Sequence, residues 1–360
     1  MKLFPLLKAL AEDRSYEIFL CSTNQQENLL TNTLAEFSLS PHFSLETNEN
    51  KSLSSVTSSI LDQATRIVTT VKPNLIVVQG DTTTTFAGAM SGFFERIPVA
   101  HLEAGLRTYD LSSPFPEEMF RRQISTIASL NLCPSQVAKS NLVNERAGGI
   151  IEVVGNTAID TLTTIFKENK SALLPKSLES KIDSSSKIVF VTCHRRENFG
   201  SGVTRVTDAI NQLAKRHKNI SFIFSVHSNP SVSSIVNAKL EKTKGVHLSE
   251  SLSYRDTQNI LRLSSLVLTD SGGIQEEVPS YGVKTLILRN STERKECLKA
   301  GVVELIDTRR DVLVEKCEEF LLDATSFESR GLTTLFTNPF GDGFSSIYSR
   351  NHINTLLGVN

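Results

Sequence analysis

The fold class is decided by one short stretch of sequence, Ser265-Leu266-Val267-Leu268-Thr269-Asp270-Ser271-Gly272-Gly273. It begins as an almost continuous apolar run and then changes abruptly to polar residues and two glycines. Such a run is typical of a strand that is buried on both faces of a parallel sheet. The glycines let the backbone turn sharply into a following helix. The stretch therefore predicts one strand-turn-helix unit of an α/β fold.

Similar apolar runs occur along the whole chain, with helical patterns between them. Strands that alternate with helices form βαβ units and a parallel sheet. The sequence therefore predicts two doubly wound, Rossmann-like domains. The expected strands are Glu17–Ser22, Leu75–Val78, Val99–Leu102, Leu130–Cys133, Ile151–Val153, Ile188–Thr192, Ile220–Val226, Gly245–Leu248, Leu266–Thr269 and Thr285–Leu288.

A polar stretch rich in lysine and serine, residues 167–187, separates the two series of strands. Its composition predicts a connection between domains. We expect a first domain over residues 1–168 and a second over residues 169–360. Residues 344–357 should form a helix; the pattern alone does not show where it packs, and this division places it in the second domain.

The composition excludes several classes of protein. The formal net charge is −1, so no basic excess is present to neutralise the phosphates of a nucleic acid. No stretch reaches the roughly 18–20 apolar residues of a membrane span, and the N-terminus lacks a signal peptide's apolar core. The five cysteines lie far apart, which argues against a disulfide framework or a structural zinc site. We expect a cytoplasmic protein that binds neither nucleic acid nor membranes.

Ligands of doubly wound folds bind beyond the carboxyl ends of the strands, so the polar residues after each strand are the candidates for a site. Ser271, Gly272 and Gly273 open a helix whose free N–H groups favour a phosphate. Glu277, one turn further on, can accept hydrogen bonds from a ribose diol. The alternative is a plain turn with Ser271 as the helix cap, and local chemistry does not decide between the two.

The first domain carries carboxylates at two neighbouring strand ends. Asp81 follows Gly80 after one strand, and Glu103 ends the next. Two carboxylates placed together raise each other's pKa, which suits groups that transfer protons near neutrality. Arg107 could offset that effect. The alternatives are a helix cap by Asp81 or Thr82 and, for the pair of carboxylates, a structural salt bridge.

Two more residues stand at suitable positions. Glu117 follows Pro116 at the start of a helix, where capping explains both residues, but a proline-rich loop can also aim the carboxylate into a cleft. His194 follows a strand and precedes Arg195 and Arg196. Such a histidine can bind a diphosphate or move protons near pH 7; the alternative is a basic surface patch.

Eight short motifs then occur in a recognisable order: Gly80–Thr85, His101–Arg107, Pro116–Glu118, Gly155–Thr157, His194–Glu197, Asp270–Glu277, Thr292–Arg294 and Asn338–Gly343. Together they resemble the motifs of the non-hydrolysing bacterial UDP-N-acetylglucosamine 2-epimerases, and the likeness covers essentially the whole chain. The resemblance implies a GT-B-like fold with a UDP-sugar in the cleft between two domains.

The resemblance also implies a reaction, the interconversion of UDP-GlcNAc and UDP-ManNAc. UDP is eliminated to give 2-acetamidoglucal and is then added back, with the proton returned to the opposite face of C2. This chemistry needs proton-transfer groups on both faces and stabilisation of the leaving diphosphate. It needs neither a nicotinamide nor a metal. A homodimer that serves surface polysaccharide synthesis is the family expectation.

By the same resemblance each candidate receives a role. Asp81, Glu103 and Glu117 would be the acid/base carboxylates, and His194 would contact the diphosphate and assist protonation. Glu277 would bind the ribose. The expected substrate-binding residues are Lys2, Arg107, His194, Ser271, Gly272, Gly273, Glu277 and Arg294.

The sequence departs from the family in four places. The family's first strand, with its Gly-Thr-Arg-Pro-Glu turn, is absent, and loss of a central strand predicts weak stability or weak activity. Residues 23–27 and Ser59 differ where relatives bind a second, activating UDP-GlcNAc, which argues against that allosteric site. Phe120 replaces an asparagine, and Thr257 replaces an aromatic residue near the uracil.

Two other functions fit the same motifs. One is an epimerase of a modified UDP-sugar, such as a diacetamido-uronic acid. The other is a UDP-sugar-binding homologue that is impaired in catalysis. Retention of the four acid/base candidates favours an active enzyme over a pure binder.

Overall fold

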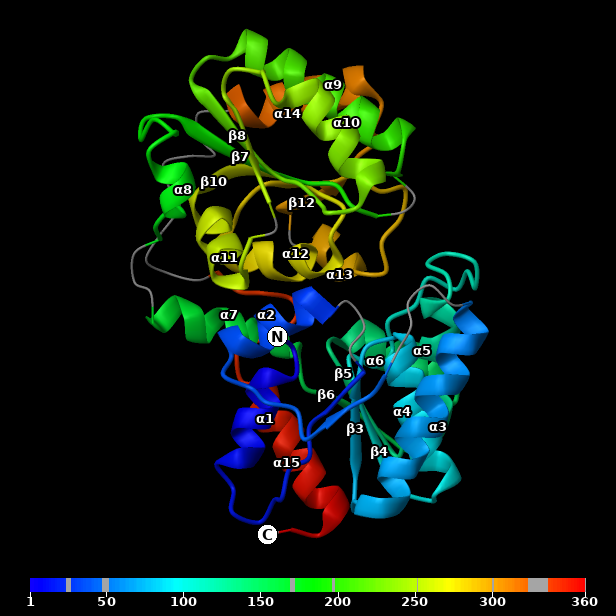
Figure 1. The fold of residues 1–360 in the computed structure, drawn as a ribbon. Coiled ribbons are helices and arrows are strands. Elements are labelled where there is room, and N and C mark those ends of the chain that lie inside the picture. Colours follow the sequence, from blue (N-terminus) through cyan, green and yellow to red (C-terminus); the bar gives the residue numbers. More distant parts are fainter. Residues whose placement is uncertain are drawn as a thin grey trace. The chain divides into compact units, whose positions relative to one another are not determined.

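The computed structural model describes residues 1–23, 27–46, 52–168, 172–195, 198–250, 252–299, 301–322 and 336–359. The chain divides into two compact units. Unit 1 consists of Met1–Thr163 together with Phe340–Asn360, and unit 2 consists of Thr164–Pro339. Each unit has parallel strands connected by helices (Figure 1). The predicted α/β fold with two doubly wound parallel-sheet domains is confirmed.

Unit 1 contains a parallel sheet of four strands in the order β3-β4-β5-β6, and a separate parallel pair, β1-β2. Its strands are β1 (Cys21–Ser22), β2 (Phe43–Ser44), β3 (Ile76–Gln79), β4 (Val99–Leu102), β5 (Leu130–Cys133) and β6 (Ile150–Val153). Its helices are α1 (Phe4–Ala11), α2 (Glu27–Glu36), α3 (Leu53–Val71), α4 (Thr83–Phe94), α5 (Glu117–Ile127), α6 (Gln136–Asn144), most of α7 (Thr157–Glu168) and α15 (Ser345–Leu357).

The four-stranded sheet is buried on both faces because its strands alternate between two apolar layers. On one face, Leu102 of β4 packs with Leu6 of α1 and Ile353 of α15. On the other, Val99 of the same strand packs with Phe120 and other apolar residues of α4 and α5. This two-sided burial explains why the strands read as continuous apolar runs.

The position of the C-terminal helix corrects the expected domain division. α15 packs against α1 (Figure 1), and Asp160 of α7 accepts hydrogen bonds from the N–H groups of Ser345 and Ser346. The helix therefore belongs to unit 1 and not to the second domain. The division after the first part also falls within α7, between residues 163 and 164, instead of after 168. An apolar helix face shows that a partner exists but does not show which one, so the pattern could not place this helix.

Unit 2 is a six-stranded parallel sheet with the order β12-β11-β10-β7-β8-β9. Its strands are β7 (Lys187–Thr192), β8 (Ile220–Ser225), β9 (Val246–Ser249), β10 (Ser264–Thr269), β11 (Thr285–Ile287) and β12 (Val303–Leu305). Its helices are the end of α7, α8 (Lys176–Glu179), α9 (Ser201–Arg216), α10 (Pro230–Leu240), α11 (Tyr254–Leu263), α12 (Gly272–Glu277), α13 (Lys295–Lys299) and α14 (Arg310–Leu322).

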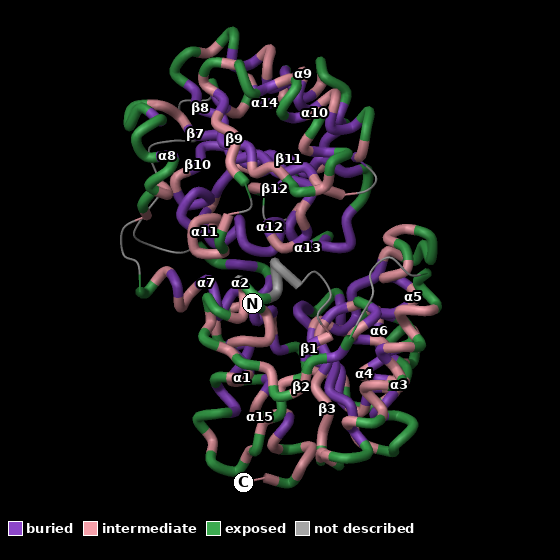
Figure 2. Tube along the Cα trace, viewed as in Figure 1, coloured by how far each residue is buried: buried purple, intermediate pink, exposed green. Residues whose placement is uncertain are grey.

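The centre of this sheet is fully buried, as the opening stretch of sequence predicts. All six residues of β10 are buried, and Figure 2 shows buried residues concentrated along β7 and β10. Helices α9, α10 and α14 contribute to the apolar cluster on one face, and α11 contacts β7 and β10. The strand order reverses between these two strands, which makes their junction the topological switch point where ligands of doubly wound folds bind.

Some local predictions differ from the structure. The expected strand Glu17–Ser22 is reduced to two residues, and the short strands β2 and β12 were not expected. The polar stretch 167–187 holds a helical turn, α8, whose Leu178 is buried; residues 169–171 lie outside the described residues. No helix in the described part of the chain combines the length and the apolar character needed to cross a membrane.

Candidate functional site

In unit 2, the candidate residues meet at the switch point of the sheet. β7 and β10 are hydrogen-bonded neighbours with Thr192 opposite Thr269, and the hydroxyls of this pair lie 2.6 Å apart. His194 therefore emerges beside Asp270 and Ser271, although 76 positions separate His194 from Asp270 along the chain. The polar residues that follow these two strands therefore lie close together within this unit.

His194 lies against Asp270, which is completely buried. The backbone N–H of His194 donates to both carboxylate oxygens, at 3.1 and 2.9 Å, and its Nδ1 lies 3.5 Å from Oδ1. The imidazole stacks on that of His227 with 5.7 Å between centroids. Burial lowers the pKa of His194, while the Asp270 carboxylate opposes that effect. The side chain is 35% exposed, so it is open to a ligand on one side; Arg196 and Glu197 lie outside the described residues.

The turn from Ser271 to Gly273 has the geometry of a close-approach site. Ser271 occupies the N-cap position of α12, but its side chain makes no capping hydrogen bond. The Ser271 side chain therefore does not cap the helix, and the phosphate site at this turn stays a prediction. A Cβ on Gly272 would lie 2.8 Å from Cζ of Arg294, whereas a Cβ on Gly273 would meet only the Ser271 hydroxyl, at 4.0 Å, among the described residues. The backbone at Gly273 is thus accessible to an approaching group.

Glu277 is held by residues that the sequence analysis did not select. Its two carboxylate oxygens accept hydrogen bonds from the Tyr254 hydroxyl, at 2.8 Å, and from Nε2 of Gln258, at 2.7 Å. Gln258 in turn accepts from the Tyr281 hydroxyl at 2.8 Å. These hydrogen bonds fix the position of the Glu277 carboxylate at the end of α12.

Arg294 lies in a buried ionic network. Its Nε donates to Glu276 at 2.6 Å, and its Nη1 contacts Glu293. Glu293 also pairs with Arg289 at 3.2 Å. The guanidinium lies directly beneath Gly272, so it adds positive charge under the turn while it is anchored by acidic partners.

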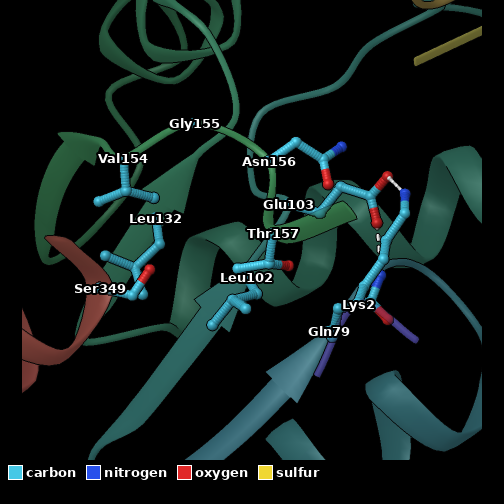
Figure 3. A pocket seen from close by; sticks show the side chains of 10 residues that line it. All are labelled: Lys2, Gln79, Leu102, Glu103, Leu132, Val154, Gly155, Asn156, Thr157 and Ser349. Atoms are coloured by element: carbon cyan, nitrogen blue, oxygen red, sulfur yellow. Dashed lines mark hydrogen bonds and ion pairs between the residues drawn. The ribbon is translucent and has the colours of Figure 1, made fainter. Parts of the chain in front are cut away.

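In unit 1, Glu103 lies at the end of β4 in an unusual backbone conformation. Its φ angle is +64°, a left-handed value that is uncommon for residues other than glycine and is often retained at functional sites. Oε1 accepts from Nζ of Lys2 at 2.5 Å, and Oε2 accepts from Nε2 of Gln79 (Figure 3). Lys2, a predicted binding residue, therefore contacts Glu103, a predicted catalytic carboxylate.

Asp81 is held by Arg121, which the sequence analysis did not select. Nη2 and Nε of Arg121 lie 2.6 and 2.7 Å from Oδ2 of Asp81. The cap of α4 is Thr82, whose hydroxyl accepts from the N–H of Thr85. The alternative of a helix cap at this position is therefore confirmed for Thr82, and Asp81 is not the cap. Arg121 stands four residues after Glu117, on the same face of α5; that spacing is the signal that could have identified it.

The three carboxylates lie at one edge of the unit 1 sheet. β3 and β4 are paired, and a Cβ on Gly80 would lie 3.6 Å from Oε2 of Glu103, so Asp81 follows a residue that touches Glu103. Glu117 begins α5, one helical turn before the arginine that binds Asp81. None of the described residues donates a hydrogen bond to the buried Oε2 of Glu117, and a buried polar atom is costly unless a ligand satisfies it.

A cavity of about 10 Å³ lies beside Glu103, which is about the space of one water molecule. It is lined by Lys2, Gln79, Leu102, Glu103, Leu132, Val154, Gly155, Asn156, Thr157 and Ser349 (Figure 3). The motif Gly155-Asn156-Thr157 therefore reaches the same edge of the sheet as the carboxylates.

Arg107 is not part of this cluster. Its side chain is fully buried and donates to Glu145, with Nη2 2.9 Å from Oε2, and to the carbonyl of Leu106. The alternative of a structural salt bridge therefore describes Arg107, although its partner is Glu145 instead of Glu103 or Asp81.

The structure shows the contacts of two residues that depart from the family pattern, Phe120 and Thr257. Phe120 is buried and stacks on Phe86, with 4.9 Å between the ring centroids, so it is part of the hydrophobic core of unit 1. Thr257 donates its hydroxyl to the carbonyl of Ser253 within α11. Residues 24–26 of the altered effector segment lie outside the described residues.

Comparison with known proteins agrees with this arrangement. The model of the family described as UDP-N-acetylglucosamine 2-epimerase matches residues 8–351. The chain belongs to this family. It is 37% identical to the UDP-N-acetylglucosamine 2-epimerase of Escherichia coli K12, over 95% of this chain and 92% of that protein. Epimerases are enzymes, so family membership supports enzyme activity for this chain.

Solved structures extend the likeness from the sequence to the fold. The UDP-GlcNAc 2-epimerase from Neisseria meningitidis, solved with UDP-GlcNAc bound, is 33% identical, with a TM-score of 0.89, and the match covers 99% of this chain and 96% of that chain. The glycosyltransferase SnogD from Streptomyces nogalater matches 98% of this chain and 90% of its own at 14% identity and a TM-score of 0.54. This second likeness concerns the fold alone and agrees with the predicted GT-B-like architecture.

Proposed function

We propose that this protein is a non-hydrolysing UDP-N-acetylglucosamine 2-epimerase that interconverts UDP-GlcNAc and UDP-ManNAc. The observation that carries the proposal is the grouping of three acidic side chains, Asp81, Glu103 and Glu117, at the carboxyl edge of the unit 1 sheet in a chain of the epimerase family. Relatives with bound UDP-GlcNAc support the choice of substrate.

The proposed reaction begins when a carboxylate takes the proton from C2 of the sugar. The electron pair of that C–H bond forms the C1–C2 double bond, and the C1–O bond breaks to release UDP. Glu103 is a candidate for this role, because it lies at the carboxyl end of β4 and its position is fixed by Lys2, whose Nζ is 2.5 Å from Oε1. UDP then adds back to the 2-acetamidoglucal, and a protonated carboxyl returns the proton to the opposite face of C2. The sequence is redox-neutral.

In this proposal, unit 2 binds the nucleotide. The N–H groups at the Ser271-Gly272-Gly273 turn and the His194 imidazole would stabilise the charge on the leaving diphosphate. Glu277 would accept hydrogen bonds from the ribose, in a carboxylate position already fixed by Tyr254 and Gln258.

The test is to incubate the purified protein with UDP-GlcNAc in D₂O and to follow C2 by NMR. We expect UDP-ManNAc to form and deuterium to appear at C2 of both sugars. A Glu103→Gln variant should bind UDP-GlcNAc but lose at least about 100-fold in exchange, since general acid/base catalysis contributes about 10²–10⁴-fold. Saturable binding by the unmodified protein without any exchange would contradict the proposal.

We further propose that the enzyme acts in the cytoplasm as a homodimer and supplies ManNAc units for a surface polysaccharide. The support for this wider role is family membership. Light scattering of the purified protein at micromolar concentration should give twice the mass of the 39.7 kDa chain; a mass of one chain would contradict the dimer.

A further inference from the structure

Asp270 follows β10 and accepts hydrogen bonds from several donors of unit 2. It is fully buried, and its carboxylate accepts from the N–H groups of His194 and Arg195 and from Nδ2 of Asn198, with the closest contacts at 2.8 to 2.9 Å. All these donors belong to the segment that follows β7. A buried carboxylate is costly unless it is satisfied in this way, so the backbone at His194 and Arg195 and the side chain of Asn198 are held by Asp270.

The same carboxylate also faces the ring of His194. Nδ1 lies 3.5 Å from Oδ1, and the ring is held flat against His227, with 16° between the ring planes. A carboxylate beside Nδ1 favours the tautomer in which Nδ1 carries the proton. Nε2 then carries the lone pair, so it can take up a proton from the ligand side, and the imidazolium that results donates from Nε2 to a diphosphate oxygen.

We propose that Asp270 is a positioning residue, which fixes the orientation and the tautomer of His194 so that Nε2 is directed to the nucleotide. The role of Nε2 rests on the proposed function, whereas the pairing of the two side chains does not. Asp270 itself touches neither the substrate nor the reacting atoms in this proposal.

The charges around the ring indicate what removal of the carboxylate would do. Among the described residues, Asp270, Arg195 and His227 are the titratable or charged groups that act on His194. Asp270 favours the protonated ring, while Arg195, His227 and burial oppose it. Loss of the negative charge should therefore lower the pKa of His194 further.

The test compares the full-length protein with Asp270→Asn. The amide oxygen can replace Oδ2 toward the backbone N–H groups, while the amide NH₂ then faces Nδ1 and favours the opposite tautomer. We expect ¹⁵N NMR of His194 to show the proton on Nδ1 in the unmodified protein and on Nε2 in the variant, with the titration midpoint moved to lower pH. The kcat for UDP-GlcNAc epimerisation should fall by about 10- to 100-fold, with a much smaller change in KM.

The matched control is Asn198→Ala, which removes one donor to the same carboxylate oxygen but keeps the charge. It should leave the tautomer and the titration midpoint of His194 unchanged. If it reproduces the changes of Asp270→Asn, or if the unmodified protein carries its proton on Nε2, the proposal is overturned. If Asp270→Asn does not fold, the tautomer of His194 in the unmodified protein still tests the proposal: a proton on Nδ1 supports it, and a proton on Nε2 overturns it. The NMR result without epimerisation would support the pairing and reject the proposed function.

Discussion

At the scale of single residues, Arg107 is a buried charged residue of unit 1 with a structural role. Arg107 pairs with Glu145, away from the carboxylates of the site. We expect Arg107→Ala to lower the free energy of unfolding by about 3 kcal/mol, because it leaves a partly buried carboxylate without its partner. Urea unfolding measures this loss. The exposed Arg122 provides the control: Arg122→Ala should change stability by less than about 0.5 kcal/mol, and equal effects would contradict the assignment.

His101 makes the stability of unit 1 depend on pH. It is fully buried, its Nε2 lies 2.8 Å from the carbonyl oxygen of Gly80, and burial lowers its pKa to about 4. The unfolded chain binds this proton below about pH 6.5, whereas the folded chain does so only near pH 4. Stability is therefore present above pH 6.5 and lost as the pH falls toward 4, by about 3 kcal/mol.

The measurement for His101 is a comparison of free energies of unfolding between pH 7 and pH 4. The unmodified protein should lose more stability over this range than His101→Gln, which has no such proton to bind. Parallel curves for the two proteins would show that His101 does not set this dependence.

The sequence pointed to the candidate site residues, but it did not point to the side chains with which they pair. Asp81, Glu103 and His194 follow strands, and a position after a strand can be read from an apolar run and a glycine. Their partners Arg121 and Asp270 come from segments about 40 and 76 residues away. Such pairs depend on which strands become neighbours, so local patterns alone could not predict them.

At the scale of elements, α15 is attached to unit 1 through its N-terminus. Asp160 accepts from the N–H of Ser345 at 3.1 Å and from the N–H of Ser346 at 2.7 Å. Asp160→Ala should cost about 1–2 kcal/mol, as the loss of a helix cap does, and should speed amide exchange over residues 345–357. Asp160→Asn keeps an acceptor and should lose less than half as much; equal exchange in all three proteins would contradict the role.

Most elements could be predicted because their patterns are strong. The long apolar strands at the centre of each sheet were expected nearly as observed. β2 and β12 have only two and three residues. Such short strands show no periodic pattern in the sequence that would predict them. Their strand character comes from the neighbours that they pair with.

At the scale of the whole molecule, nucleotide binding should affect the two units unequally. The proposed UDP contacts, His194, the Ser271–Gly273 turn and Glu277, all belong to unit 2. UDP at 100 times its Kd should stabilise the protein by about 2.7 kcal/mol. Hydrogen exchange should show protection at residues 194–195 and 271–277, with uridine as a control that lacks the diphosphate. Protection confined to unit 1 would contradict the assignment.

The number and class of the domains could be predicted from the sequence, but the path of the chain through them could not. Strand-helix alternation shows that two parallel sheets form. The return of residues 340–360 to unit 1 depends on the packing of α15 against α1, which is a contact between distant segments.

This return has a consequence for how the protein is made. A ribosome releases α1 before unit 2 and α15 after it. The nascent chain can complete unit 2 before Ile353 of α15 is available to pack against Leu6 of α1. Unit 1 begins first but should be the last to resist a protease during translation, so its apolar surface is the part that a chaperone would have to protect.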